Sequence, residues 1–162
     1  MRMPYGFPAL ALIVLVVVLT AAKQPGRDPV HDPFLEEQAQ IREIIDKIVM
    51  DAENADIEGL QAIHLDSEKF TKFGPRSFER QDVANTNQSE AAFFGTISNY
   101  KQQSRDLKID VFGEVAIATY YPYVSFEQEG ELNEGSGRQT LVFLKASNGW
   151  KIVHEHGTRR CE

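Results

Sequence analysis

Two spacings of apolar residues divide the chain into a helical first part and a β-rich second part. Between residues 34 and 53, apolar positions recur at helical spacing with charged residues between them, which predicts one amphipathic helix. Asn54 or Asp56 can cap a short second helix, and Ser89 can cap a third. The predicted helices cover residues 34–53, 54–64 and 89–100, with a short strand at residues 69–74.

Beyond residue 104, apolar and polar residues alternate, which is typical of strands with one buried face. Turn-like residues at 130–137 and at 147–149 predict two hairpins. The four predicted strands cover residues 105–113, 114–128, 138–146 and 149–158. Helices followed by a run of strands predict an α+β fold, in which three N-terminal helices pack on one face of a strongly bent antiparallel sheet.

The amino terminus predicts export. An uncharged apolar run from Ala9 to Ala22 follows a single early arginine and is short for a membrane span. We expect residues 1–22 to be a signal peptide that is cleaved after Ala22, or a signal anchor if the run is counted from Phe7. Residues 23–33 predict a linker and residues 34–160 one domain. The domain is then secreted or periplasmic, and it is attached to a membrane only if the segment is uncleaved.

Composition narrows the possible partners. The net charge is -7 and no long run of Lys or Arg is present, which argues against nucleic acid as a partner. The only cysteine is Cys161, so no internal disulfide can form. The sequence gives no pattern that predicts a cofactor.

The order of elements and the ending "GRQTLVFLKASNGWKIVHEHGT" resemble the SnoaL-like branch of the nuclear-transport-factor-2-like superfamily. The similarity is strongest to the association domain of calcium/calmodulin-dependent kinases and its bacterial stand-alone relatives, which share a stretch like "NADIEGLQAIHLDSEKFTKFGP". The resemblance covers residues 36–158. It implies a cone of helices wrapped by a bent sheet, a pocket inside the cone, and dimers or rings built through the sheet. The superfamily includes isomerases, dehydratases, cyclases and members without a known reaction, so the fold implies no single activity.

The last strand holds two histidines around one acid. Strand alternation places His154 and His156 on one face with Trp150, and Glu155 on the other. A zinc site needs at least a third protein ligand, which the sequence does not supply, so no metal is predicted. The histidines can move protons, or can form hydrogen bonds across strands or an interface. The resemblance implies that Val153, Glu155 and Gly157 lie on the inner face of the sheet and that the two histidines lie on its outer face.

Glu155 is therefore the predicted acid–base residue. A buried carboxyl with a raised pKa can serve as a general base, but the group can equally pair with Lys151 or another nearby cation. The resemblance also turns Tyr121 toward the pocket. Its hydroxyl can then donate to a substrate carbonyl, or the ring can simply belong to the core. Thr119 and Tyr123 share its face.

Two functions remain open from the sequence. The first is an exported ligand-binding or assembly domain, a homodimer or larger homo-oligomer, with a pocket for a small apolar or aromatic ligand. The second is an isomerase- or dehydratase-type enzyme that uses Glu155 or a histidine as the base and Tyr121 as the donor. Arg138, which starts a strand, can bind a carboxylate or pair with acids at the rim. The predicted ligand-binding residues are Thr119, Tyr121, Tyr123, Arg138, Leu141, Phe143, Val153, His154 and His156.

Overall fold

A computed structural model describes residues 26–75 and 77–160 of the chain. The predicted export segment, the start of the linker and Cys161 lie outside these residues. No helix among the described residues is both long enough and apolar enough to cross a membrane.

Three helices precede or interrupt the strands, and the first two were predicted correctly. They are α1 (Leu35–Glu53) and α2 (Ile57–Gln61). The Asp56 side chain caps α2 by accepting a hydrogen bond of 2.9 Å from the backbone N–H of Gly59.

The third helix, α3 (Val83–Phe94), begins earlier than predicted. The Asp82 carboxylate caps it by accepting from the backbone N–H of Asn85 at 2.8 Å. Ser89, the predicted cap, lies inside the helix, and its hydroxyl donates back to the carbonyl of Thr86. The apolar residues after Ser89 therefore end the helix instead of starting it.

Five strands form one sheet in the order β1-β5-β4-β3-β2. Their bounds are β1 (Thr71–Phe73), β2 (Ser98–Phe112), β3 (Val115–Gln128), β4 (Glu131–Ala146) and β5 (Gly149–Arg159). The four long strands are antiparallel as predicted, but β1 pairs in parallel with β5, so the sheet is mixed. Parallel pairing is possible because α3 and three strands separate β1 from β5 in the chain, which leaves ample length for the crossover.

The hairpin between β3 and β4 is longer than predicted. The register is constant from Gln128 and Glu131 at the turn to Val115 and Leu144 at the far end, although Tyr121 and Pro122 are not paired with β4. The turn itself consists of Glu129 and Gly130, which both have positive φ (54° and 83°). Such a tight turn matches the twist of the strands. Residues 131–137, in which Leu132 is the one large apolar side chain, therefore extend β4, although their composition predicts a loop.

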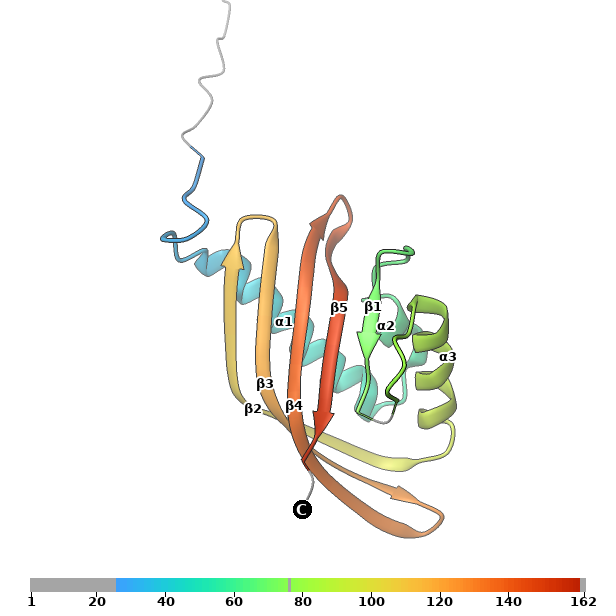
Figure 1. Ribbon diagram of the computed structural model, residues 1–162. Helices are drawn as coiled ribbons and strands as arrows, with labels where there is room; N and C mark the ends of the chain where they lie inside the picture. Colours follow the sequence, from blue (N-terminus) through green and yellow to red (C-terminus); the bar gives the residue numbers. More distant parts are fainter. Residues whose placement is uncertain (1–25, 76, 161–162) are drawn as a thin grey trace, which may run out of the picture.

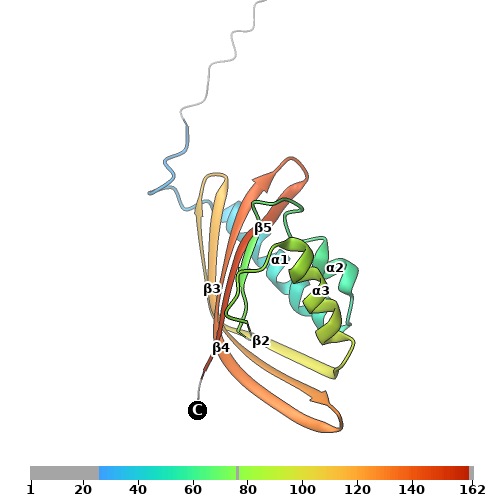
Figure 2. The ribbon, with the colours of Figure 1, turned by 45° about the vertical axis from the view of Figure 1, so that its right-hand side comes forward.

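The helices cover only the concave face of the sheet, while the opposite face has no helix over it (Figures 1 and 2). Along α1, Ile41 and Ile45 are fully buried against the sheet. Phe143 on β4 and Ile152 on β5 belong to the same buried cluster. Ile152 also lines the cavity between the helices and the sheet, so this core continues into the wall of that cavity.

A β-bulge in β5 sets the direction of its side chains. Ile152 pairs with Phe143, and His154 pairs with the adjacent Val142, so Val153 is an extra residue without a partner on β4. As a result Trp150, Ile152 and Glu155 are all buried on the concave side. Simple alternation, which grouped Trp150 with the histidines, is wrong because the bulge reverses the parity.

Deletion of Val153 should therefore be tolerated, because every inward residue of β5 keeps its face. Deletion of Lys151 moves Trp150 to the outer face, with an expected cost of about 3 kcal/mol or more. Urea unfolding followed by tryptophan fluorescence measures both changes. Deletion of Val153 should cost less than about 2 kcal/mol. Equal losses in the two variants would contradict the role given to the bulge.

Candidate functional site

A cavity of about 440 Å³ lies between the helices and the concave face of the sheet. Its lining is mainly apolar and aromatic, and includes Phe93, Phe94, Tyr120, Val124, Phe126 and Leu141. The size and lining are those of a site for a small organic molecule.

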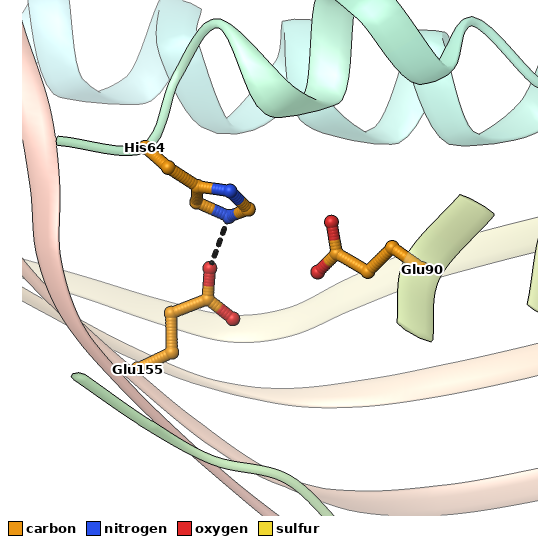
Figure 3. A group of neighbouring side chains, drawn as sticks. All are labelled: His64, Glu90 and Glu155. Atoms are coloured by element: carbon orange, nitrogen blue, oxygen red, sulfur yellow. Dashed lines mark hydrogen bonds and ion pairs between the residues drawn. The ribbon is translucent and has the colours of Figure 1, made fainter. Parts of the chain in front are cut away.

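Four charged residues from four segments meet at the wall of this cavity. His64 follows α2, Lys72 lies on β1, Glu90 on α3 and Glu155 on β5. His64 Nε2 lies 2.8 Å from Glu155 Oε1, while Lys72 Nζ lies 3.0 Å from Glu155 Oε2 and 2.5 Å from Glu90 Oε1. Figure 3 shows His64, Glu90 and Glu155 directed toward one another. We call these four residues the charged cluster.

Glu155 is buried and ionised. Burial by itself would raise the pKa of its carboxyl, but the charge of Lys72 and the hydrogen bond from His64 outweigh burial and lower that pKa to about 2. The prediction that the pKa of Glu155 is raised is therefore wrong. The alternative prediction, that its carboxyl pairs with a nearby cation, is confirmed. The partner is Lys72, since the ammonium group of Lys151 donates to the carbonyl of Ala62 at 2.6 Å.

His64 is held in its protonated form. Its Nδ1 lies 2.9 Å from Oδ1 of Asn87, and its Nε2 contacts the carboxylate of Glu155. Both partners accept hydrogen bonds, so both ring nitrogens donate and the ring is positive. Burial lowers the pKa of His64, but the hydrogen bond and charge of Glu155 outweigh it and raise that pKa above 6.5.

The spacing of the charged cluster is compatible with a metal ion. Ligand atoms of His64, Glu90 and Glu155 all lie within 4.8 Å of one another. In this chain the ammonium group of Lys72 already bridges the two carboxylates. A metal would have to displace that lysine, so the residues present do not fit a resident metal ion.

Tyr120 contributes a neutral hydroxyl beside the cluster. Burial raises the pKa of Tyr120, and the nearby negative charge of Glu155 raises it further. The group therefore stays protonated and can donate a hydrogen bond into the cavity.

The predicted inward set on β3 is wrong by one residue. Ala118 and Tyr120 are buried on the concave side. Thr119, Tyr121 and Tyr123 consequently point to the other face, and Tyr121 is 51% exposed. The resemblance supplied the wrong register here, and a shift of one residue reverses every side chain of a strand.

Other predicted residues are divided between the cavity and the core. Leu141 lines the cavity, whereas Phe143 is fully buried in the core and Val153 forms the bulge. Arg138 is exposed at the rim of the cavity. Across residues 26–75 and 77–160 it makes no ion pair with a carboxylate, so the expected pairing with nearby acids does not occur.

The two histidines of β5 lie on the outer side of the sheet, as the resemblance implied. His154 Nδ1 lies 2.7 Å from the hydroxyl of Thr71 on β1. Both His154 and His156 make edge-on contacts with the ring of Phe73. The structure therefore separates them from the cavity.

Sequence reasoning missed His64, Lys72 and Glu90. One signal could have found Lys72, which stands two residues after Phe70 on a predicted strand and so shares its inward face. No comparable signal marks His64 or Glu90, because their proximity to Glu155 depends on the docking of β1 and α3.

Residues 41–158 match the SnoaL-like domain family, and the chain belongs to this family. Its fold is that of NTF2-like proteins. A proposed dehydratase of the NTF2-like family from Streptomyces avermitilis is 17% identical, with a TM-score of 0.72 over 78% of this chain and 98% of that chain. An NTF2-like superfamily protein from Salmonella enterica is 21% identical, with a TM-score of 0.72 over 79% and 94% of the two chains.

A proposed calcium/calmodulin-dependent protein kinase II association domain from Xanthomonas campestris is also similar. It is 12% identical, with a TM-score of 0.66 over 76% of this chain and 87% of that chain. No curated protein sequence matches the chain. At these identities the likeness shows the fold alone.

The low pKa of Glu155 predicts a specific loss of stability in acid. Because the pKa falls from 4.5 to about 2 on folding, this contribution is present above pH 4.5 and is lost as the pH falls toward 2. It is on the order of 3 kcal/mol. Urea unfolding between about pH 2 and about pH 6 should show a shallower pH dependence in Glu155→Gln than in the wild type.

The matched control is Glu58→Gln, which removes an exposed carboxyl on α2. This variant should keep the wild-type pH dependence. The assignment fails if Glu155→Gln also keeps it.

Proposed function

We propose that this protein binds a small, mainly apolar or aromatic molecule inside the cone. The observation that supports the proposal is a ligand-sized cavity with a mainly apolar lining and four charged groups gathered at one wall. The rings of Phe93, Phe94 and Phe126 form the apolar surface.

The charged cluster favours a ligand that is uncharged. The cluster consists of two cations and two carboxylates that contact one another. Its net charge is therefore zero. A charged group placed against this wall would lose its hydration without gaining an unpaired counter-charge.

A carbonyl or hydroxyl oxygen on the ligand would find donors at this wall. The ammonium group of Lys72 has three N–H bonds, and two are directed to Glu90 and Glu155. The third, together with the hydroxyl of Tyr120, can donate to such an oxygen. The preferred ligand is thus an apolar or aromatic molecule with one acceptor oxygen, for which 1-tetralone is a suitable probe.

Filling the cavity should abolish this binding. Val124→Trp adds a ring at a half-buried position on the cavity wall, and should weaken 1-tetralone binding at least tenfold by calorimetry. Val115→Trp makes the same exchange at the exposed end of β3 and should leave the affinity unchanged. Native mass spectrometry of the wild type should also show any ligand retained from the host. No probe binding and no retained ligand would contradict the proposal.

Export and self-association belong to the same proposal. The apolar amino-terminal run supports a location outside the cytoplasm. The outer face of the sheet supports a homodimer or larger assembly, because no helix covers it and it exposes Phe112 and Leu144. The same mass spectrum gives the mass of the mature chain and its copy number, and a monomer would count against assembly.

A second function, isomerase- or dehydratase-type catalysis, is favoured by the buried phenol of Tyr120, which lines the same cavity as the charged cluster. A buried phenol can donate a hydrogen bond that polarises a substrate carbonyl, whereas both N–H groups of His64 are bonded to Asn87 and Glu155. Both oxygens of Glu155 are engaged by cations, which makes it a poor base. Glu90 Oε2 has no hydrogen bond to another described residue, which makes Glu90 the better candidate for the base.

The two neighbouring tyrosines provide a matched test of catalysis. The wild type should accelerate exchange of the α-protons of 1-tetralone for deuterium, measured by NMR. Tyr120→Phe should reduce the rate about a hundredfold or more by removing the inward donor, while Tyr121→Phe should have no effect. No exchange above the buffer rate in the wild type would exclude this activity for the probe, without affecting the binding proposal.

A further inference from the structure

A second hollow, on the outer side of the sheet, is lined by arginines. Its volume is about 650 Å³, and its lining includes Arg105, Tyr121, Tyr123, Arg138, Arg159 and Arg160. We call it the arginine hollow. Its lining residues come from the carboxy-terminal end of β5 and from the middle of β2, β3 and β4. The end of β5 lies beside β4 near the bend of the sheet (Figure 1).

The register of the strands brings these side chains together. Arg105 on β2 pairs with Tyr121 on β3, and Arg138 on β4 pairs with Thr158 on β5. Adjacent strands lie about 5 Å apart, so guanidinium groups from separate strands share one small surface. The backbone N–H of Arg160 donates to the carbonyl of Ser136 at 2.9 Å, which fixes the last arginine beside β4.

Arg105 is held in place before any ligand binds. Its guanidinium lies over the ring of Tyr123, 4.3 Å from the centroid. Its Nε and Nη2 donate to Oε1 of Gln103 at 3.2 and 3.0 Å. The remaining N–H bonds are available to an acceptor, and the ordering of this side chain lowers the entropy lost on binding.

The four guanidinium groups have no acidic partners in the part of the chain that the structure describes. None makes an ion pair with a carboxylate within 4.0 Å, although the chain has 24 acidic residues against 17 basic ones. The acid at the edge of the hollow is Glu134, whose carboxylate accepts from the hydroxyl of Tyr123 at 2.6 Å. Among the described residues, the hollow is therefore a concentration of positive charge without carboxylate partners, on a protein that is acidic as a whole.

We propose that the arginine hollow binds a ligand with two joined phosphate groups. The planar guanidinium forms paired hydrogen bonds with phosphate oxygens, and Arg is preferred over Lys for this geometry. One phosphomonoester has only about two negative charges near neutral pH, so a diphosphate is the better match to four guanidinium groups. The exposed hydroxyls of Tyr121 and Thr158 add neutral donors to the same surface.

This site is separate from the proposed function of the cone. Arg138 and Arg159 border both the inner cavity and the outer hollow. Arg105 and Arg160 line the outer hollow and do not border the inner cavity. Substitutions at these two positions can therefore test the hollow without changing the cavity wall.

The experiment is calorimetric titration of the purified protein with inorganic pyrophosphate at low ionic strength. Arg105→Gln combined with Arg160→Gln should weaken binding at least tenfold, and added salt should weaken wild-type binding. Arg42→Gln combined with Arg80→Gln makes the same change of charge at exposed positions elsewhere and should alter the affinity less than twofold. Thermal unfolding of each variant verifies that the fold is retained.

Two further titrations identify the source of the diphosphate. Tighter binding of ADP than of pyrophosphate supports a soluble nucleotide, and tighter binding of geranyl diphosphate supports an isoprenoid lipid precursor. The proposal is overturned if pyrophosphate does not bind, if it binds no better than inorganic phosphate, or if the two double variants lose affinity equally. Binding of 1-tetralone should be unchanged in the Arg105→Gln and Arg160→Gln variant, so failure here is distinguishable from failure of the proposed function.

Discussion

The bridge that Lys72 forms between Glu155 and Glu90 is the interaction on which the site depends. Its ammonium group joins β1, β5 and α3, and so fixes the parallel edge of the sheet and the helix that closes the cavity. A buried ion left without its partner costs about 3–5 kcal/mol, so the three groups must be ordered together. The same balance keeps Glu155 ionised and His64 protonated. These four charged groups are therefore held together at one part of the cavity wall.

The bulge at Val153 is the second constraint, and it explains how one strand serves two purposes. Before it, Trp150 and Ile152 belong to the core, and after it Glu155 still faces inward. The extra residue also increases the local twist, as expected for a sheet that must wrap around helices. The histidines are displaced to the outer face, where they contact Phe73 instead of the cavity.

The two faces of the sheet differ in how their charges are balanced. Inside the cone, each cation of the charged cluster has a carboxylate partner, which suits an uncharged ligand. On the outer face, Arg105 and Arg138 make no such pair with any described carboxylate, and so remain available to an external anion. One curved sheet can thus present two chemically different sites on its opposite sides.

The sequence by itself determined the α+β class and the four long strands, because hydrophobic spacing is a local pattern, and its resemblance to a known family gave the inward direction of Glu155. It did not determine the parallel docking of β1, the bulge or the true inward tyrosine. Tyr120 and Tyr121 are adjacent and chemically identical, and only the packing of Ala118 and its neighbours against the core selects between them. The partners of Glu155 likewise come from residues 64, 72 and 90, which no local pattern connects. Only the tertiary structure, in which each buried charge must meet an opposite charge, brings them together.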